Sequence, residues 1–193
     1  MQITEVLGEL FALFKKCEIE FMVGGSFASG AWGEPRHTND IDIVADINSE
    51  SASCLEANAP PIFQTGTEEL KLALETRTQD ASFQMLHNEG LFKVDVFVLS
   101  SHKLDQSAFS RKVRIELAPG LAAFCQSPED MVLQKLRWYE LGNRVSDRQW
   151  HDVVKMLEIQ HENLDVRYMN NWAEKLGLHD LLLQALAEAW NGG

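Results

Sequence analysis

Hydrophobic residues recur along the chain with two different periods, which predict a mixture of strands and helices followed by helices alone. Apolar side chains at helical spacing predict a helix over residues 3–16, whereas alternating apolar and polar side chains predict a strand over 41–45. The other elements predicted before Pro119 are helices over 26–32 and 49–57 and strands over 20–23, 81–87, 91–99 and 111–117.

The last third of the chain has only the helical period. Ser127 and Pro128 are typical of an N-cap and a first helical position, and they predict the start of a helix. Ser146 and Gln149 have the spacing of a capping box and predict the start of a second helix. Residues 164–190 add one or two more helices.

This order of elements predicts an α+β fold. Strands and helices that alternate first, with helices alone afterwards, are typical of a mixed core followed by a helical part. We expect a small mixed β-sheet flanked by helices over residues 1–120, and a C-terminal helical part over 121–193 that packs on it.

The composition is that of an ordinary globular protein, but its charge is strongly acidic. The 193 residues include 17 Lys and Arg against 29 Asp and Glu, a formal net charge of −12. Most of this excess lies in residues 1–100. Such a surface repels a phosphate backbone, so we expect no binding of bulk DNA or of an anionic membrane.

The chain carries no visible targeting signal. Residues 1–9 lack the cationic and apolar regions of a signal peptide, and no apolar run approaches the roughly 20 residues of a membrane span. Cys17, Cys54 and Cys125 are scattered and form no CxxC pair, so idle thiols are expected rather than a disulfide framework or a zinc cluster. The expected location is a reducing cytoplasm.

A glycine pair ends the first predicted strand. Gly24 and Gly25 lie between that strand and the helix that begins near Ser26. Glycine lets the backbone come close to a ligand, and a helix N-terminus presents free N–H groups to a phosphate. The segment therefore fits a phosphate site, although an ordinary tight turn has the same pattern.

Two aspartates share one face of the predicted strand over 41–45. Asp40 and Asp42 lie about 7 Å apart along a strand, while Ile41 and Ile43 point into the core. Adjacent carboxylates repel each other unless a cation lies between them, and hard oxygen ligands suit Mg²⁺ or Mn²⁺. The alternative is a strand with a polar, solvated outer face.

A third aspartate, Asp95, lies alone in a strongly hydrophobic strand. Strand propensity and desolvation both disfavour a carboxylate there. Its position is explained if it joins Asp40 and Asp42, because three carboxylates can hold the two divalent ions used in phosphoryl and nucleotidyl transfer.

Together these segments resemble the nucleotidyltransferase superfamily of the polymerase-beta type. The resemblance depends on Val23-Gly24-Gly25-Ser26, on Asp40-Ile41-Asp42-Ile43 and on the later strand residue Asp95. The run Arg36-x-Thr38-x-Asp40-x-Asp42 is similar to the toxin nucleotidyltransferases of AbiEii-type toxin–antitoxin pairs and to their uncharacterised relatives.

The resemblance continues into the predicted helices and covers roughly residues 20–158. Lys135 and the segment Arg148-x-x-x-Asp152 resemble helical motifs that follow in those toxins. Their last motif opens with an Arg-Asp dipeptide, whereas here Gln149 follows Arg148. As alternatives, Arg148 and Asp152 have the spacing of an ordinary helix ion pair, and Lys135 could face solvent.

The resemblance implies a role for each matching position. Asp40, Asp42 and Asp95 would be catalytic metal ligands, and Asp95 would also help to deprotonate the acceptor hydroxyl. The implied nucleotide-binding residues are Gly24, Gly25, Ser26, Arg36, Thr38, Lys135 and Arg148.

The implied reaction moves a nucleoside monophosphate from an NTP to an acceptor hydroxyl, with two Mg²⁺ or Mn²⁺ ions as cofactors. The acceptor could be tRNA, a protein or a small molecule such as an aminoglycoside. The alternative is a non-catalytic member of the same fold that binds a nucleotide or a partner, including an antitoxin-like protein.

Overall fold

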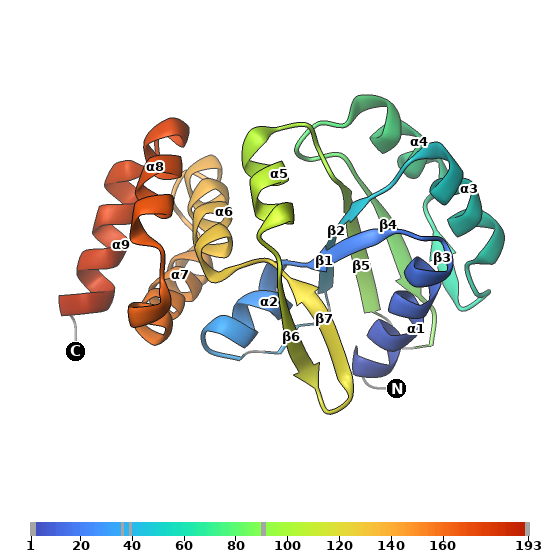
Figure 1. Ribbon diagram of the computed structural model, residues 1–193, viewed down its shortest axis with the longest axis horizontal. Helices are drawn as coiled ribbons and strands as arrows, with labels where there is room; N and C mark the ends of the chain where they lie inside the picture. The colour runs from blue at the N-terminus through green and yellow to red at the C-terminus, as the bar shows by residue number, and fades with distance from the viewer. Residues whose placement is uncertain (1–2, 36, 39, 90–91, 192–193) are drawn as a thin grey trace. The chain divides into compact units, whose positions relative to one another are not determined.

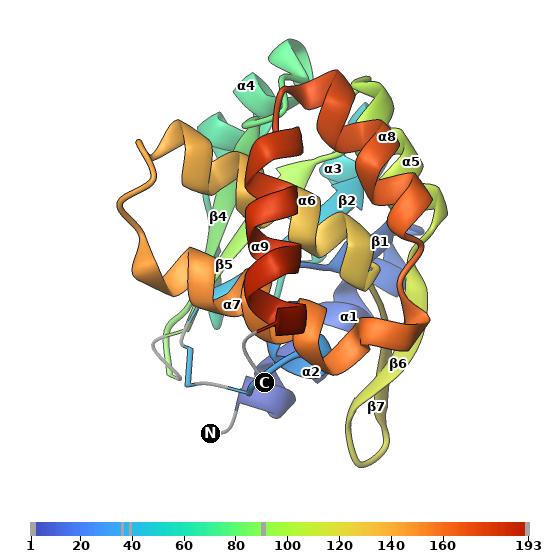
Figure 2. The same ribbon diagram turned by 90° about the vertical axis from the view of Figure 1, so that its left-hand side faces the viewer.

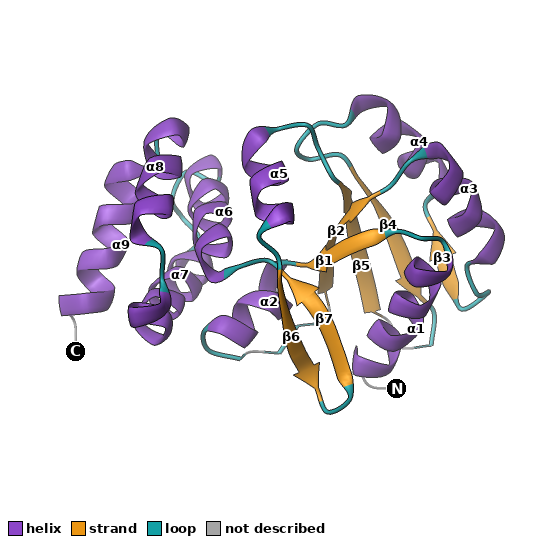
Figure 3. Cartoon of the chain, in the orientation of Figure 1, coloured by secondary structure: helices purple, strands orange, loops and turns teal. Residues whose placement is uncertain are grey.

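The computed structural model describes residues 3–35, 37–38, 40–89 and 92–191, and it divides into two compact units. The sheet unit comprises Met1–Phe27 and His37–Cys125, and the helical unit comprises Ala28–Arg36 and Gln126–Gly193. Figure 3 shows the strands gathered in the sheet unit. The predicted α+β class, a mixed sheet flanked by helices and followed by a helical part, is confirmed. The domain limits at residue 120 stay a prediction.

One mixed sheet forms the centre of the sheet unit (Figure 1). Its described strands are β1 (Glu20–Val23), β2 (Asp40–Asp46), β3 (Phe63–Thr65), β4 (Ser82–His87), β5 (Phe92–Val98), β6 (Val113–Ala118) and β7 (Leu121–Cys125). They lie in the order β3-β4-β5-β2-β1-β7-β6. The central strand β2 is antiparallel to β1 and parallel to β5. The predicted glycine turn follows β1, and the predicted Asp95 lies on β5, so both lie next to the strand that carries Asp40 and Asp42.

The two faces of β2 have different surroundings. Ile41, Ile43 and Ala45 are fully buried in the main core, which they share with side chains of α1 (Ile3–Lys16), α3 (Ser49–Asn58) and α4 (Thr67–Thr76). On the opposite face, Val44 packs against Met22 and against α5 (Lys103–Ser110). Because side chains alternate along a strand, Asp40 and Asp42 share the face of Val44 and lie outside the main core.

The helical unit contains α6 (Pro128–Leu141), α7 (Asp147–Gln160), the short 3₁₀ turn His161–Asn163, α8 (Val166–Leu176) and α9 (His179–Asn191) (Figure 2). The predicted N-caps are confirmed, since the hydroxyls of Ser127 and Ser146 accept backbone N–H groups of the helices that they open. The return bond of the predicted capping box is not confirmed, because Gln149 Oε1 accepts from the ammonium of Lys135. The end of α2 (Gly25–Trp32) belongs to this unit, because the indole of Trp32 donates to the carbonyl of Gln126 at 2.8 Å. Across the described residues, no helix has the length and apolar character needed to cross a membrane.

Four elements of the sheet unit were not predicted: β3, β7, α4 and α5. Strand β3 is only three residues long, and the short helices α4 and α5 carry too few apolar side chains to show a clear period. Strand β7 was missed because Pro119 and Gly120 indicated the end of the core, whereas they form the turn of a hairpin between β6 and β7. Gly120 has φ +78°, a conformation that suits glycine.

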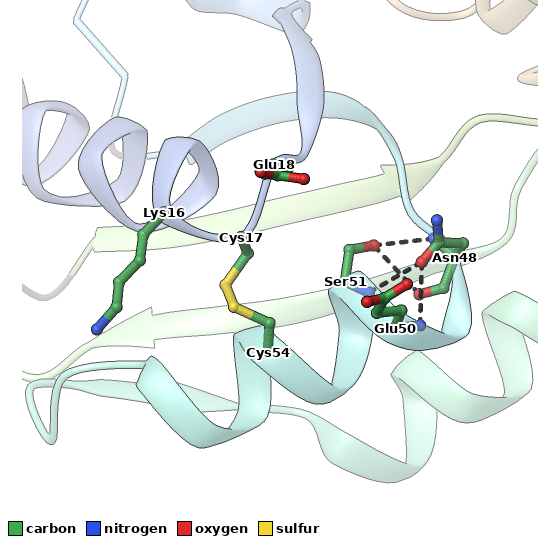
Figure 4. A pocket seen from close by; sticks show the side chains of 7 residues that line it. All are labelled: Lys16, Cys17, Glu18, Asn48, Glu50, Ser51 and Cys54. Atoms are coloured by element: carbon green, nitrogen blue, oxygen red, sulfur yellow. Dashed lines mark hydrogen bonds between the residues drawn. A yellow bond between two sulfur atoms is a disulfide. The ribbon is translucent and has the colours of Figure 1, made fainter.

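The prediction that all three cysteines are idle thiols is wrong for two of them. Cys17, which follows α1, forms a disulfide with Cys54 of α3 (Figure 4). The tertiary fold brings their Cα atoms to 5.5 Å although 37 positions separate them in the sequence, and this spacing lies within the usual range for disulfides. Only Cys125 is a free thiol among the described residues, and burial raises its pKa to about 12.

Candidate active site

The strand pairing of β2 with β5 brings two of the predicted acids together. Asp42 lies directly opposite Asp95, and Asp40 lies opposite Lys93. Paired positions on neighbouring parallel strands are about 4.8 Å apart and point to the same face. The three predicted carboxylates therefore lie on one face of the sheet, on the two strands that the sequence indicated.

Lys93 lies among these carboxylates and was not singled out by the sequence. Its ammonium donates to Asp95 Oδ2 at 2.8 Å and lies 4.0 Å from Asp40 Oδ1. The hydrogen bond that Lys93 donates to Asp95 raises the pKa of Lys93, and the charges of Asp95, Asp40 and Asp42 add to this effect against the opposing effect of partial burial. The alternation of β5 could have identified it, because Lys93 and Asp95 share a strand face.

The glycine turn lies against Asp42. The N–H of Gly24 donates to the carbonyl oxygen of Asp42 at 2.9 Å, which continues the β1–β2 pairing up to the turn. Gly25 then adopts φ +57° and begins α2. A Cβ atom at Gly25 would overlap the carboxylate of Asp42 and come within 2.7 Å of its Cβ. The sequence suggested that the glycines let the backbone approach a bound phosphate, and that stays a prediction. What the structure shows is a close approach of Gly25 to the side chain of Asp42, a predicted metal ligand.

Replacing this glycine tests the close approach. Gly25→Ala should destabilise the protein by about 2 kcal/mol or more, because the left-handed backbone alone costs an alanine roughly 1–2 kcal/mol before the overlap with Asp42 is counted. The free energy of unfolding in urea measures this effect. Gly8→Ala is the matched control, since Gly8 lies in α1 with nothing within 4 Å of an added Cβ. Equal stability of the two variants would contradict the close approach.

Two further predicted residues, Thr38 and Ser26, belong to the described part of the sheet unit. The N–H of Asp40 donates to the hydroxyl of Thr38 at 3.2 Å, so Thr38 orders the start of β2. Ser26 is half-buried in the first turn of α2. Arg36 lies outside the described residues. The nucleotide-binding roles of these residues stay predictions.

The predicted residues of the helical unit form a cluster of their own. Lys135 of α6 is only 4% exposed and donates to Asp152 Oδ2 at 2.9 Å and to Gln149 Oε1 at 3.0 Å. The alternative that Lys135 faces solvent is therefore wrong. Asp152 pairs with this lysine of the neighbouring helix, while Arg148 is exposed. Gln149, which replaces the expected aspartate of the toxin motif, takes part in holding the ammonium.

The carboxylate pair fits a divalent cation that arrives with a nucleotide. Among the described residues, no three His, Cys, Asp or Glu side chains are grouped as a complete metal site. Mg²⁺ needs only one or two protein carboxylates when phosphates and water supply the remaining oxygens. Asp42 and Asp95, opposite each other beside the glycine turn, provide such a pair.

Comparisons with known proteins agree with this fold. No protein-family model and no curated protein sequence matches the chain. The solution structure of the antibiotic-resistance factor ANT(2'')-Ia is similar, with a TM-score of 0.53 and 15% identity over 95% of this chain and 92% of that one. The crystal structure of ANT(2'')-Ia in complex with adenylyl-2''-tobramycin gives a TM-score of 0.59 and 13% identity over 90% and 95% of the two chains.

A third similar structure is an antigenic nucleotidyltransferase-like protein from Paracoccidioides brasiliensis. Its TM-score is 0.52 at 15% identity, over 97% of this chain and 96% of that one. At these identities the likeness shows the fold alone. The chain therefore has the fold found in nucleotidyltransferases, over nearly its full length and nearly the full length of these neighbours.

Proposed function

We propose that the protein is a metal-dependent nucleotidyltransferase, which moves a nucleoside monophosphate from an NTP to an acceptor hydroxyl. The observation that carries the proposal is the register of β2 and β5, which sets Asp42 opposite Asp95 beside the turn at Gly25. The fold shared with nucleotidyltransferases supports it. The resemblance of the segments at Gly24, Asp40 and Asp95 to the motifs of that superfamily also supports it.

The chain's own residues have distinct roles in this proposal. A triphosphate would bind at the turn of Gly24 and Gly25, where the first N–H groups of α2, including that of Ser26, would donate to its oxygens. Because Gly25 touches Asp42, a phosphate bound at the turn would lie beside the carboxylates. Thr38 holds the start of β2 in place, and Arg36 would add a cationic contact to the nucleotide.

Asp40, Asp42 and Asp95 would hold Mg²⁺ or Mn²⁺, which when bound offsets the negative charge of the phosphates and lowers the pKa of the acceptor hydroxyl. Asp95 would accept the proton of that hydroxyl. The nucleotide-binding roles of Lys135 and Arg148 stay predictions, because the ammonium of Lys135 is buried and is held by Asp152 and Gln149.

The acceptor and the partner belong to the same proposal. ANT(2'')-Ia in its complex with adenylyl-2''-tobramycin shows that this fold can serve a small-molecule acceptor, and tRNA and protein hydroxyls are the other candidates. On the run from Arg36 to Asp42 we extend the proposal to an AbiEii-type toxin with an antitoxin-like partner.

One observation favours a second function, a nucleotide-binding or partner-binding protein without turnover. The ammonium of Lys93 already lies on Asp95, where a catalytic cation would bind. Such a protein would bind nucleotide without transferring it.

Calorimetry with ATP, GTP, CTP and UTP, each with and without Mg²⁺, would test binding. Incubation of an α-labelled NTP with tRNA, protein and small-molecule fractions would test transfer. Metal-dependent binding followed by transfer of label is the expected result. Binding without transfer to any fraction favours the second function. No binding of any NTP with Mg²⁺ or Mn²⁺ overturns the enzyme and the nucleotide-binding form of the second function, and leaves only partner binding.

A further inference from the structure

We propose that Lys93 is a built-in counter-ion of the carboxylate site, which a divalent cation must displace, so that the site accepts the cation with a nucleotide in preference to the cation alone. This inference rests on the proposed function. It concerns the order in which the same site is loaded, and it makes Lys93 a positioning residue.

The geometry places the ammonium where a cation is needed. Two register pairs of β2 and β5 lie next to each other on one face of the sheet. They are Asp40 with Lys93 and Asp42 with Asp95. The lysine touches Asp95 at 2.8 Å and approaches Asp40 at 4.0 Å. Neighbouring carboxylates repel each other, and the ammonium beside Asp95 and Asp40 offsets part of that repulsion without any bound ion.

The same contact makes the lysine a competitor of a metal ion. The oxygen that accepts from Lys93 is Oδ2 of Asp95, one of the oxygens available to a divalent cation. Two cations on one carboxylate oxygen repel each other, so the ammonium must leave before the metal binds well. The side chain of Lys93 is 38% exposed, which leaves it free to move once its partner is taken.

A nucleotide gives the displaced ammonium a new partner. Lysine binds phosphate as a mobile point charge, and the triphosphate would arrive at the turn of Gly25, beside Asp42. The cation alone displaces Lys93 without compensation, whereas the cation with a triphosphate supplies anionic oxygens to the ammonium. Metal binding is therefore coupled to nucleotide binding through one side chain.

The pair differs from an ordinary surface ion pair of the same unit. Lys71 and Glu68 lie one turn apart on α4, and their side chains are 58% and 85% exposed. In contrast, Asp95 is 17% exposed and belongs to the strand beside β2. Lys71 is thus a suitable control, since its removal changes the net charge equally without touching the carboxylates.

The test is Mn²⁺ binding by electron paramagnetic resonance, first without nucleotide. Lys93→Met should bind Mn²⁺ about tenfold more tightly than the wild type, because a competing ion pair and one positive charge are lost. Lys93→Arg keeps the charge and should bind Mn²⁺ as weakly as the wild type, as should Lys71→Met. Lys93→Gln serves if the methionine variant does not fold.

A second titration adds a non-hydrolysable NTP analogue. The analogue should strengthen Mn²⁺ binding several-fold more in the wild type than in Lys93→Met, whose metal affinity is already high. If Lys93→Met binds Mn²⁺ no more tightly than the wild type without nucleotide, the role of Lys93 is overturned. It is also overturned if Lys93→Arg gains as much Mn²⁺ affinity as Lys93→Met. Transfer activity in that same wild-type preparation leaves the proposed function standing, whereas a wild type that neither binds Mn²⁺ nor transfers label overturns both.

Discussion

Asp42→Asn is expected to lower the rate of nucleotidyl transfer about a thousandfold, while the protein still folds. Asparagine has nearly the shape of aspartate but offers a neutral amide, so it would lose most of its attraction for Mg²⁺. The main core is preserved, because it is formed by Ile41 and Ile43 on the other face of β2. The rate is measured with the α-labelled NTP, and folding by thermal unfolding in EDTA.

The matched control for this variant is Asp46→Asn. Asp46 lies on the same strand and the same face, but it is exposed and pairs in register with Glu20 at the far end of β1. It should transfer label at the wild-type rate. Mg²⁺ with nucleotide should raise the unfolding temperature of the wild type and of Asp46→Asn, but not that of Asp42→Asn. Unchanged transfer by Asp42→Asn would end the proposal of a metal-dependent enzyme.

The positions of the acids could be predicted because strand alternation is a local property. Each of Ile41 and Ile43 is followed or preceded by a polar residue, which assigns the carboxylates of β2 to the outer face. The same argument places Asp95 outside the core formed by Val94 and Val96. The pairing of Asp42 with Asp95 was beyond this reasoning, since register depends on how two distant strands meet.

Other features were missed for the same physical reason. Alternation within β5 puts Lys93 on the face of Asp95, but its position opposite Asp40 depends on the register of β2 and β5. Gln149 contributes only because α7 lies beside α6. The disulfide depends on the packing of α1 against α3, which no spacing of cysteines in the sequence reveals. In each case local patterns identified the elements, and tertiary contacts decided which side chains meet.

Cys17→Ser is expected to lower the free energy of unfolding by roughly 4 kcal/mol under oxidising conditions, because the disulfide closes a long loop in the unfolded chain. For a chain of this size that corresponds to a fall of roughly 10 °C in the unfolding temperature. Cys54→Ser should give the same result, since either change removes the same cross-link. Differential scanning calorimetry, with and without a phosphine reductant, provides the measurement.

The response to reductant separates the cross-link from a simple packing defect. Reductant should lower the unfolding temperature of the wild type to that of the two serine variants and leave those variants unchanged. Cys125→Ala is the control, because Cys125 is buried and free, and it should keep the full response. Titration of the denatured, unreduced wild type should find one reactive thiol, which is Cys125, and reduction should release those of Cys17 and Cys54. A wild type whose unfolding ignores the reductant would show that the bond contributes nothing to stability. In that case the packing of α1 and α3 against the sheet would hold this end of the unit without it.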